Sequence, residues 1–301
     1  PGADFTGTLE IVSIDIPEGL DGDLSLELMT DIWARNLVPE RPSSAHKGTF
    51  GSTLVLAGSK NYVGAAYLAS SAAARVGSGL VTLAIPSSLQ IDIASLAMET
   101  TYIPLRESES GLASPEAARE VIEALPRYQA FLVGCGMGRS SKTEELLSRI
   151  LFTNQKLPPT VIDADGLNWL SSCELNWWEK LTDDTVLTPH PGEMARLTRM
   201  SVKDVDSDRI DVARNFASKW QKIVVLKGAH TVVAFPSGVA MVSPFVNPGL
   251  ATAGTGDVLA GAIAGLLSQG VTPQNSAALG VYLHGLAGEV IRGFMGEAGV
   301  L

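Results

Sequence analysis

Four consecutive residues late in the chain, Gly254, Thr255, Gly256 and Asp257, have the types and order of an anion-binding helix start. The small residues leave backbone N–H groups uncovered just before an apolar run that predicts a helix over residues 257–269. Unpaired N–H groups and the helix dipole attract phosphate to such a terminus. Asp257 would then accept a proton from a hydroxyl group bound beside that phosphate. Alternatively Asp257 is an ordinary helix cap, although a cap alone does not need small residues before it.

Two further polar segments follow predicted strands. Residues 227–231 read KGAHT between two β-branched runs. They form either a tight hairpin that turns at Gly228 or a loop whose backbone faces a nucleotide. Residues 190–193 read HPGE, in which Pro and Glu are typical of a helix start. His190 either faces a ligand at the strand end or has a structural role.

A glycine pattern and two aspartates complete the candidates. Residues 134–138 read GCGMG, which permits either close backbone approach to a ligand or a simple strand-to-helix turn. Because residue 139 is Arg, the full GxGxxG pattern is absent. Asp163 and Asp165, in the sequence DADG, either bind a cation or cap the next helix. The sequence has no P-loop, GxSxG, HExxH or CxxC motif.

The elements that position these segments alternate along the chain. Short β-branched runs predict strands, listed here by number: 52–58, 80–86, 130–138, 160–166, 184–190, 223–228 and 231–235. Helical patterns predict helices over 62–77, 115–125, 140–152, 192–198, 208–221, 257–269 and 273–292. Strands that are apolar on both faces predict a large, mostly parallel central sheet with helices on both faces, an α/β fold. Ligands in such folds bind at the carboxyl ends of the strands.

Composition limits the function classes. The chain has 301 residues, 46% apolar and 18% charged, which is enough for a large core and argues against disorder. A net charge of −10 gives no basic footprint for nucleic acid. The longest apolar stretch, 258–267, is too short to span a membrane, so no membrane contact is expected. The two cysteines, Cys135 and Cys173, favour a reducing compartment, and a cytoplasmic location is expected.

Seven segments in order resemble the NAD(P)H-hydrate dehydratases, carbohydrate-kinase-like repair enzymes. The likeness covers about residues 40–290 and is carried by HKGTFGSTLVLAGSKNYVGAAYLAS, ARVGSGLVTLAIP, VGCGMG, VIDADGLNWL, LTPHPGEMARL, VLKGAHTVV and NPGLATAGTGDVLAG. The resemblance implies a ribokinase-like fold. It also implies that the enzyme, a carbon–oxygen lyase, dehydrates hydrated NADH or NADPH (NADHX or NADPHX) and consumes a nucleotide.

The resemblance also implies roles for individual residues. Asp257 matches the catalytic base. The nucleotide-binding positions are Lys227, Gly228, Ala229, His230, Thr231, Gly254, Thr255 and Gly256. The hydrate-binding positions are Ala65, Gly138, His190, Glu193 and Asp257. Leu250, where Met is common, and Cys135, where Pro is common, are mild departures.

Cofactors and partners follow from the same likeness. Residues 1–30 resemble the joint after a hydrate epimerase domain, as in bacterial fusions, and residues 31–301 form the dehydratase domain. Bacterial members convert ADP to AMP and phosphate with Mg²⁺, whereas eukaryotic members use ATP, so ADP is expected. No residue is assigned as a metal ligand. A homo-oligomer is expected, with the Ala-rich helix at 62–77 as a possible contact. The chain also stops soon after Gly299, where the family usually continues into a final helix.

Two other functions remain open at this point. A small-molecule kinase of the same superfamily, of the hydroxyethylthiazole or hydroxymethylpyrimidine type, would use the same anion hole and the same type of aspartate. Its product would be a stable phosphorylated alcohol. A non-catalytic module would bind nucleotide without turnover.

Overall fold

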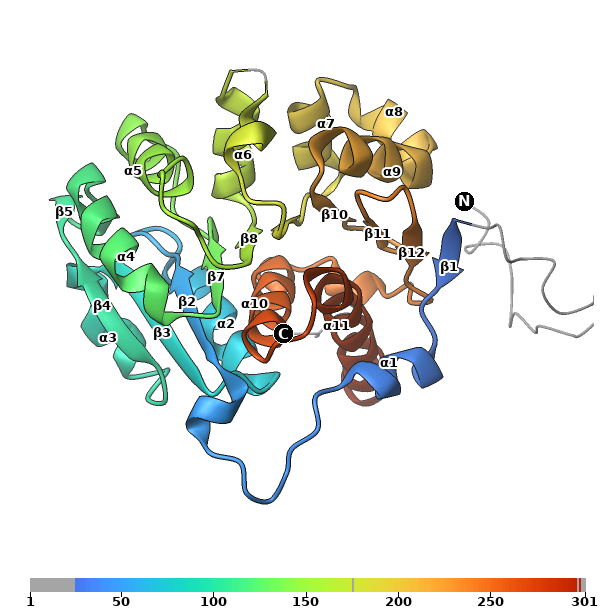
Figure 1. Ribbon diagram of the computed structural model, residues 1–301, viewed down its shortest axis with the longest axis horizontal. Coiled ribbons are helices and arrows are strands. Elements are labelled where there is room, and N and C mark those ends of the chain that lie inside the picture. Colours follow the sequence, from blue (N-terminus) through green and yellow to red (C-terminus); the bar gives the residue numbers. More distant parts are fainter. Residues whose placement is uncertain (1–24, 175, 297, 299–301) are drawn as a thin grey trace, which may run out of the picture.

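A ten-stranded sheet forms the centre of the computed structural model, which describes residues 25–174, 176–296 and 298 (Figure 1). The order across the sheet is β1-β12-β11-β10-β9-β8-β7-β2-β3-β4, and only β11 runs antiparallel to its neighbours. The strands are β1 (Leu26–Leu28), β2 (Ser52–Leu56), β3 (Leu80–Pro86), β4 (Thr101–Leu105), β7 (Ala130–Val133), β8 (Thr160–Ile162), β9 (Thr185–Leu187), β10 (Ile223–Leu226), β11 (Val232–Ala234) and β12 (Ala240–Val242). A separate hairpin pairs β5 (Glu107–Glu109) with β6 (Leu112–Ala113).

Helices cover both faces of the sheet (Figure 1). The helices are α1 (Asp31–Leu37), α2 (Val63–Arg75), α3 (Gln90–Ala94), α4 (Ala118–Ala124), α5 (Ser141–Leu151), α6 (Asp165–Ser172), α7 (Pro191–Thr198), α8 (Val202–Ser207), α9 (Arg209–Trp220), α10 (Thr255–Ser268) and α11 (Pro273–Met295). Helices α4 to α9 pack on one face, and α1, α2, α3, α10 and α11 pack on the other. This arrangement confirms the predicted fold class.

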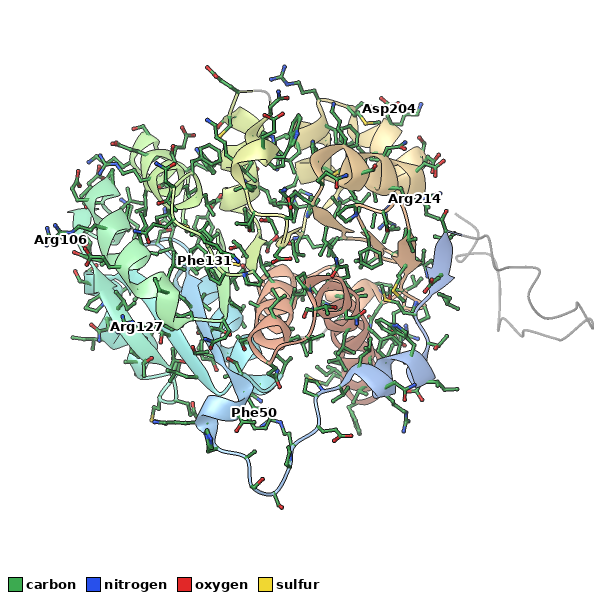
Figure 2. The ribbon with its side chains drawn as sticks, in the orientation of Figure 1. Phe50, Arg106, Arg127, Phe131, Asp204 and Arg214 are labelled. Carbon is green, nitrogen blue, oxygen red and sulfur yellow. The ribbon has the colours of Figure 1, made fainter. Side chains whose placement is uncertain are left out.

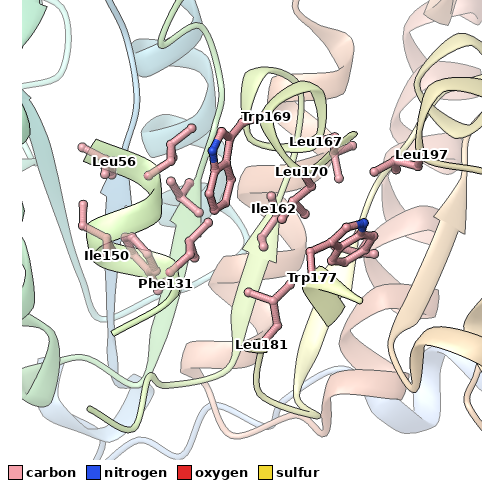
Figure 3. Close-up of a cluster of buried hydrophobic side chains, with 14 of the residues drawn as sticks. Leu56, Phe131, Ile150, Ile162, Leu167, Trp169, Leu170, Trp177, Leu181 and Leu197 are labelled. Atoms are coloured by element: carbon pink, nitrogen blue, oxygen red, sulfur yellow. The ribbon is translucent and has the colours of Figure 1, made fainter. Parts of the chain in front are cut away.

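Successive strand residues enter two different cores, because side chains alternate across a sheet. In β2, Leu54 and Leu56 join the core under α4 to α9, whereas Val55 joins the core under α2 and α10. Phe131 of β7 is fully buried in the first of these cores, where Trp169 also packs (Figure 3). Strands buried on both faces therefore show no polar alternation in sequence.

Charged side chains lie at the periphery. Figure 2 shows Arg106, Arg127 and Asp204 on the outside of the molecule and Phe131 between the sheet and its helices. Charge buried next to the sheet is therefore an exception, and it occurs mainly at the carboxyl ends of the strands.

The chain reverses its direction across the sheet between β2 and β7. From β2 it builds outward through β3 and β4, and from β7 it builds the other way through β8, β9 and β10. The carboxyl ends of β2 and β7 are joined by a backbone hydrogen bond from Gly58 N to the Cys135 carbonyl, 2.9 Å. Such a switch point opens a crevice in which ligands bind.

Helix α10 approaches α2 closely. A Cβ at Gly261 would lie 2.1 Å from the carbonyl oxygen of Ala69, and one at Gly265 would lie 2.6 Å from that of Ala73. Only glycine permits this backbone contact, which fixes the position of the N-terminus of α10. The alanine face of α2 is therefore used inside the domain. Residues on the other side of α2 stay partly exposed, and a contact between copies of the chain through this helix stays a prediction.

All seven predicted strands and all seven predicted helices are present, with shorter bounds for most strands. The predicted elements do not include α1, α3, α8, β4, β5, β6 or β12, and α6 is predicted only as the helix after Asp165, without bounds. Residues 26–28 lie in the predicted lead-in, yet they form β1 and pair with β12. Residues 1–24 of the proposed joint, which is predicted over 1–30, lie outside the described residues, as does the chain after Gly299 where a final helix is expected to be lost. No helix in the described ranges is long and apolar enough to cross a membrane.

Candidate active site

The N-terminus of α10 is open at the carboxyl edge of the sheet. Gly254 is its N-cap, with φ 93°, and among the described residues no side-chain hydrogen bond caps this helix start. A Cβ at Gly254 would lie 2.6 Å from Leu68 Cδ1, so both the backbone angle and the packing favour glycine. Asp257 is the third helical residue and is not the cap. Uncapped N–H groups and a helix dipole favour an anion at this terminus, and the anion site stays a prediction.

A buried ion-pair cluster faces this terminus. Lys227, directly after β10, places its Nζ 2.9 Å from Asp163 Oδ1 and 3.8 Å from Glu193 Oε2. Thr188 donates its hydroxyl to the same Asp163 oxygen at 2.7 Å. A Cβ at Gly256 would lie 3.4 Å from the Lys227 ammonium. The ammonium therefore lies at the first turn of α10.

Cys135 lies on the other side of Asp163. Its Sγ is 3.9 Å from Asp163 Oδ2, and ligand atoms of Cys135, Asp163 and Asp257 all lie within 4.8 Å of one another. Burial, followed by the charges of the two aspartates, raises the pKa of the Cys135 thiol well above its ordinary value. The sulfur therefore stays protonated and acts as a weak donor to a carboxylate.

Two carboxyl groups at the site have raised pKa values. Burial and then the charge of Asp163 raise the pKa of Asp257 to about 6. Burial raises the pKa of Glu193 to about 7, although Lys227 opposes the shift. A carboxylate with a pKa near 6 is a stronger base than an ordinary aspartate and is still ionised at neutral pH. Asp257 thus has the proton affinity that general-base chemistry needs.

A cavity of about 330 Å³ opens beside the N-terminus of α10. Its walls include Lys227, Gly228, Ala229 and Thr231 of the 227–231 loop, Thr255 and Gly256 of α10, and Phe245, Leu250 and His284. Burial lowers the pKa of His284 to about 4, so this side chain is neutral. A largely apolar cavity with convergent backbone N–H groups suits a nucleotide.

The 227–231 loop joins antiparallel β10 and β11, so the hairpin is confirmed, and four of its five residues also line the cavity. His230 does not line it: its ring Nδ1 is 3.0 Å from the Ser243 carbonyl oxygen, which ties the loop to the segment after β12. Arg209 holds the loop from behind, through a 3.0 Å hydrogen bond to the Leu226 carbonyl and a further bond to that of Ala229. Nothing local in the sequence marks Arg209.

Gly138 lies in a second cavity, of about 610 Å³, at the switch point. Its N–H donates to Asp165 Oδ2 at 2.8 Å, and Lys60, Tyr62 and Arg139 line the same space. Ala65 lies beside this cavity against the GCGMG turn, since a Cβ at Gly136 would lie 2.7 Å from Ala65 Cβ. The glycines of this turn therefore allow close approach of α2.

His190 and Glu193 cap α7 reciprocally. His190 Nδ1 accepts hydrogen bonds from the N–H groups of Gly192 (3.0 Å) and Glu193, and Glu193 Oε2 accepts one from His190 N at 2.8 Å. The structural role considered for His190 is thus present. The His190 ring is half exposed, while Glu193 is buried and also faces Lys227. The HPGE segment therefore both starts a helix and supplies a carboxylate to the cluster.

The expectation that Asp163 or Asp165 caps α6 is wrong. The N-cap is Ala164, in a strained conformation with φ 48° and ψ −113°, and no side chain bonds to the helix start. This turn sends the two aspartates in different directions, Asp163 to Lys227 and Asp165 to Gly138. Asp163 does contact a cation, as the other alternative expected, but this cation is the ammonium of Lys227.

The donor set decides how Mg²⁺ fits here. Magnesium prefers hard oxygen ligands and usually keeps several waters while it binds phosphate oxygens. Asp163 and Glu193 already face an ammonium, and the Cys135 thiol is a poor ligand for this metal. Asp257 is the remaining carboxylate of this cluster. These residues suit a Mg²⁺ held mostly by phosphate and water with Asp257 beside it, rather than by a protein cage.

Comparison with known proteins places this geometry in a family. The sequence model of the NAD(P)H-hydrate dehydratases matches residues 53–296. A bifunctional NAD(P)H-hydrate repair enzyme of Moorella thermoacetica is 42% identical over 294 residues, which are 96% of this chain and 54% of that protein. The ADP-dependent (S)-NAD(P)H-hydrate dehydratase of Neisseria meningitidis is 36% identical over 90% of this chain and 87% of its own. This chain thus spans about half the length of the bifunctional relatives it matches.

Solved structures of other proteins share this fold. The ADP/ATP-dependent NAD(P)H-hydrate dehydratase of Bacillus subtilis, crystallised with ATP and Mg²⁺, superimposes with a TM-score of 0.78 at 30% identity, covering 91% of this chain and 93% of that one. A hydroxyethylthiazole kinase of Pyrococcus horikoshii gives a TM-score of 0.56 at 15% identity, which shows a shared fold alone.

Proposed function

This chain belongs to the NAD(P)H-hydrate dehydratase family, and we propose that it removes water from hydrated NADH or NADPH while ADP is converted to AMP and phosphate. The observation that carries the proposal is one constellation. A base with a pKa of about 6, Asp257, lies in the first turn of a helix with an open N-terminus, beside a buried ammonium and a nucleotide-sized cavity.

The first step transfers a phosphoryl group. Asp257 takes the proton from the ring hydroxyl of the hydrate, and the hydroxyl oxygen bonds to the terminal phosphorus of ADP. The bond from that phosphorus to the bridging oxygen breaks, and AMP leaves with the electron pair. On this proposal the N–H groups of Thr255 and Gly256, at the open start of α10, stabilise charge on the phosphoryl oxygens.

The second step expels phosphate. Hydroxide is a poor leaving group, whereas a phosphate is a good one. The carbon–oxygen bond breaks as the lone pair of the ring nitrogen forms a double bond to carbon, and phosphate leaves with the electron pair. Loss of a proton from the adjacent ring carbon then restores the dihydronicotinamide. The sum is hydrate plus ADP to dinucleotide, AMP, phosphate and a proton.

When bound, Mg²⁺ supplies charge neutralisation and orientation for the phosphates. On this proposal Asp257 is the protein carboxylate beside it. On this proposal each of the two substrates binds in one of the two cavities. ADP binds against the 227–231 loop and α10. The hydrate binds in the cavity that Gly138 lines and extends to Ala65 and His190, with its ring hydroxyl directed to Asp257.

The proposal extends to the whole protein. The Moorella relative is named a bifunctional repair enzyme, which supports fusion of this domain to a hydrate epimerase through residues 1–30. The homo-oligomeric state is also kept as a proposal, and light scattering measures it directly.

A turnover assay tests the function. The protein is incubated with NADHX and Mg²⁺ plus either ADP or ATP, and the return of dihydronicotinamide absorbance is followed. Recovery with ADP and release of AMP in equal amount are expected. Recovery with ATP alone would overturn the choice of donor. A stable phosphorylated alcohol with no recovery would favour a kinase, and nucleotide binding with no reaction would favour a non-catalytic module.

A further inference from the structure

The position of the Lys227 side chain is not explained by nucleotide binding through the backbone N–H groups of the 227–231 loop. A loop that binds nucleotide through N–H groups needs no particular residue type at this position, yet the ammonium of Lys227 reaches across to the first turn of α10. Its Nζ lies 3.4 Å from the Cβ position of Gly256. Lys227 is also largely buried, with 19% of its side chain exposed. Burying an ammonium is costly unless carboxylates compensate for the lost hydration.

Asp163 fixes this ammonium. The Asp163 side chain is 2% exposed, and its Oδ1 accepts two hydrogen bonds, from Lys227 at 2.9 Å and from the Thr188 hydroxyl at 2.7 Å. Glu193 adds a second carboxylate at 3.8 Å from the same ammonium. Asp163 itself comes from a turn whose strained residue, Ala164, aims the two flanking aspartates apart.

A buried ion pair is weak evidence for stability, because replacement by apolar residues often stabilises a protein. Backbone strain of this kind persists mainly where surrounding structure and function require it. Here the pair and the strained turn together hold one positive charge at the place where negative charge would gather on a transferred phosphoryl group.

We infer that Asp163 is a positioning residue that, together with Thr188, holds the Lys227 ammonium against the N-terminus of α10, where the ammonium binds the terminal phosphate of a nucleoside diphosphate. The inference deepens the proposed function and rests on it. Lys227 exchanges no proton in this role. It distinguishes ADP from AMP, because only the terminal phosphate of ADP reaches the first turn of α10.

The test measures the binding of ADP and AMP by calorimetry, in the absence of the hydrate. Lys227→Met and Asp163→Asn should each weaken ADP binding about tenfold while AMP binding changes less than about twofold. Thr188→Val, which removes one hydrogen bond from Asp163 and keeps the shape, should act in the same direction and less strongly. It keeps the test available if Asp163→Asn fails to fold.

The double variant Asp163→Asn/Lys227→Met shows whether Asp163 acts through Lys227. If it does, the double variant loses no more ADP affinity than Lys227→Met alone. A matched control is Asp183→Asn, which breaks another lysine–aspartate pair, at Lys222 (3.4 Å), and should leave both affinities unchanged.

Three results would overturn the inference: equal loss of ADP and AMP affinity, no loss of either, or losses that add in the double variant. The binding readout does not depend on turnover. If wild-type protein fails to dehydrate NADHX but these affinities change as expected, the proposed reaction fails and the assignment of Asp163 stands.

Discussion

Each end of strand β10 carries a lysine paired with an aspartate, and the two pairs differ in whether the aspartate is exposed or buried. Before the strand, Lys222 pairs with Asp183 at 3.4 Å, and the Asp183 side chain is 95% exposed. After the strand, Lys227 pairs with buried Asp163 at 2.9 Å and also faces Glu193. Burial dominates at Lys222 and lowers its pKa, since the exposed partner compensates only in part. Burial has the same tendency at Lys227, but Asp163 and Glu193 outweigh it and raise the pKa.

The difference shows where this fold accepts unfavourable local structure. At the amino end of β10, the carboxylate of the pair stays in water, and a left-handed residue, Gln221, ends a helix in an ordinary way. At the carboxyl end, carboxylates are buried close together and Ala164 is strained. Burial and then the charge of Asp163 raise the pKa of Asp257 to about 6 at this end. Four experiments test whether the contrast is functional.

The largest effect is expected from Asp257→Asn. The amide keeps the shape but cannot take the hydroxyl proton, so turnover should fall by about 10³-fold or more while the fold is retained. Initial rates of dihydronicotinamide recovery and a thermal melt measure the two properties. Asp183→Asn, at the other end of the sheet, is the control and should keep normal rates. Near-normal turnover in Asp257→Asn would remove its role as base.

The second experiment is the pH profile. Because Asp257 must be ionised to accept a proton and its pKa is about 6, kcat/KM should fall about tenfold between pH 7 and pH 5. An ordinary aspartate, with a pKa near 4, would remain ionised and give an almost flat profile over that range. Intrinsic tryptophan fluorescence at each pH checks that the protein stays folded. A flat profile in folded protein would contradict the raised pKa.

The third experiment compares glycines at the two ends of α10. Gly254, with φ 93°, precedes the helix, and Gly270, with φ 85°, follows it and has open space around its Cβ position. Alanine at either position should lower the free energy of unfolding by about 1–2 kcal/mol because of the backbone angle. Only Gly254→Ala should also weaken ADP binding, by about three- to tenfold, because its Cβ would displace Leu68 and the helix start.

Chemical denaturation and calorimetry measure the two quantities on the same samples. Loss of ADP affinity in Gly270→Ala as well would mean that stability, rather than the helix N-terminus, controls binding.

The smallest effect concerns the strained turn. Ala164→Gly removes about 1–3 kcal/mol of strain and costs about 0.5–1 kcal/mol of chain entropy, so the free energy of unfolding should rise by about 1 kcal/mol. Gln221→Gly, at an ordinary left-handed helix end with φ 54°, should gain a similar or smaller amount. Turnover should decline only in Ala164→Gly, because a looser turn positions Asp163 less well. Unchanged turnover in both variants would separate the strain from function.

Much of the fold could be predicted because its strands are buried on both faces and its helices end at local signals. The segments that were missed lack such signals. Strand β4 contains Pro104 at the sheet edge, where its missing N–H is tolerated, and β12 has three residues. Helix α1 has seven residues and buries only Ala34. Short elements such as these depend on the sheet beside them rather than on their own sequence.

The site divides in the same way. The helix start at Gly254 to Asp257 and the 227–231 loop could be recognised because small residues before a helix and glycine in a turn have local meanings. The pair of Asp163 with Lys227 could not be found in this way. The two residues are far apart in sequence, and only the order of β8, β9 and β10 brings them together. The position of Ala164 as the N-cap of α6 could not be predicted either, because alanine gives no indication of a positive φ.

The pairing of β1 with β12 constrains the order in which the chain folds. Leu26 pairs with Ala240, so the first described strand finds its neighbour only after the chain has been synthesised as far as β12. Contacts between such distant residues form slowly, because loop closure must precede them. Ser243, just after β12, holds His230 and the 227–231 loop through contacts within one hairpin, whereas His284 of α11 supplies another part of the wall of the same cavity. On the proposed function, nucleotide affinity therefore requires both the hairpin and α11, and its appearance during refolding would report that these two parts have assembled.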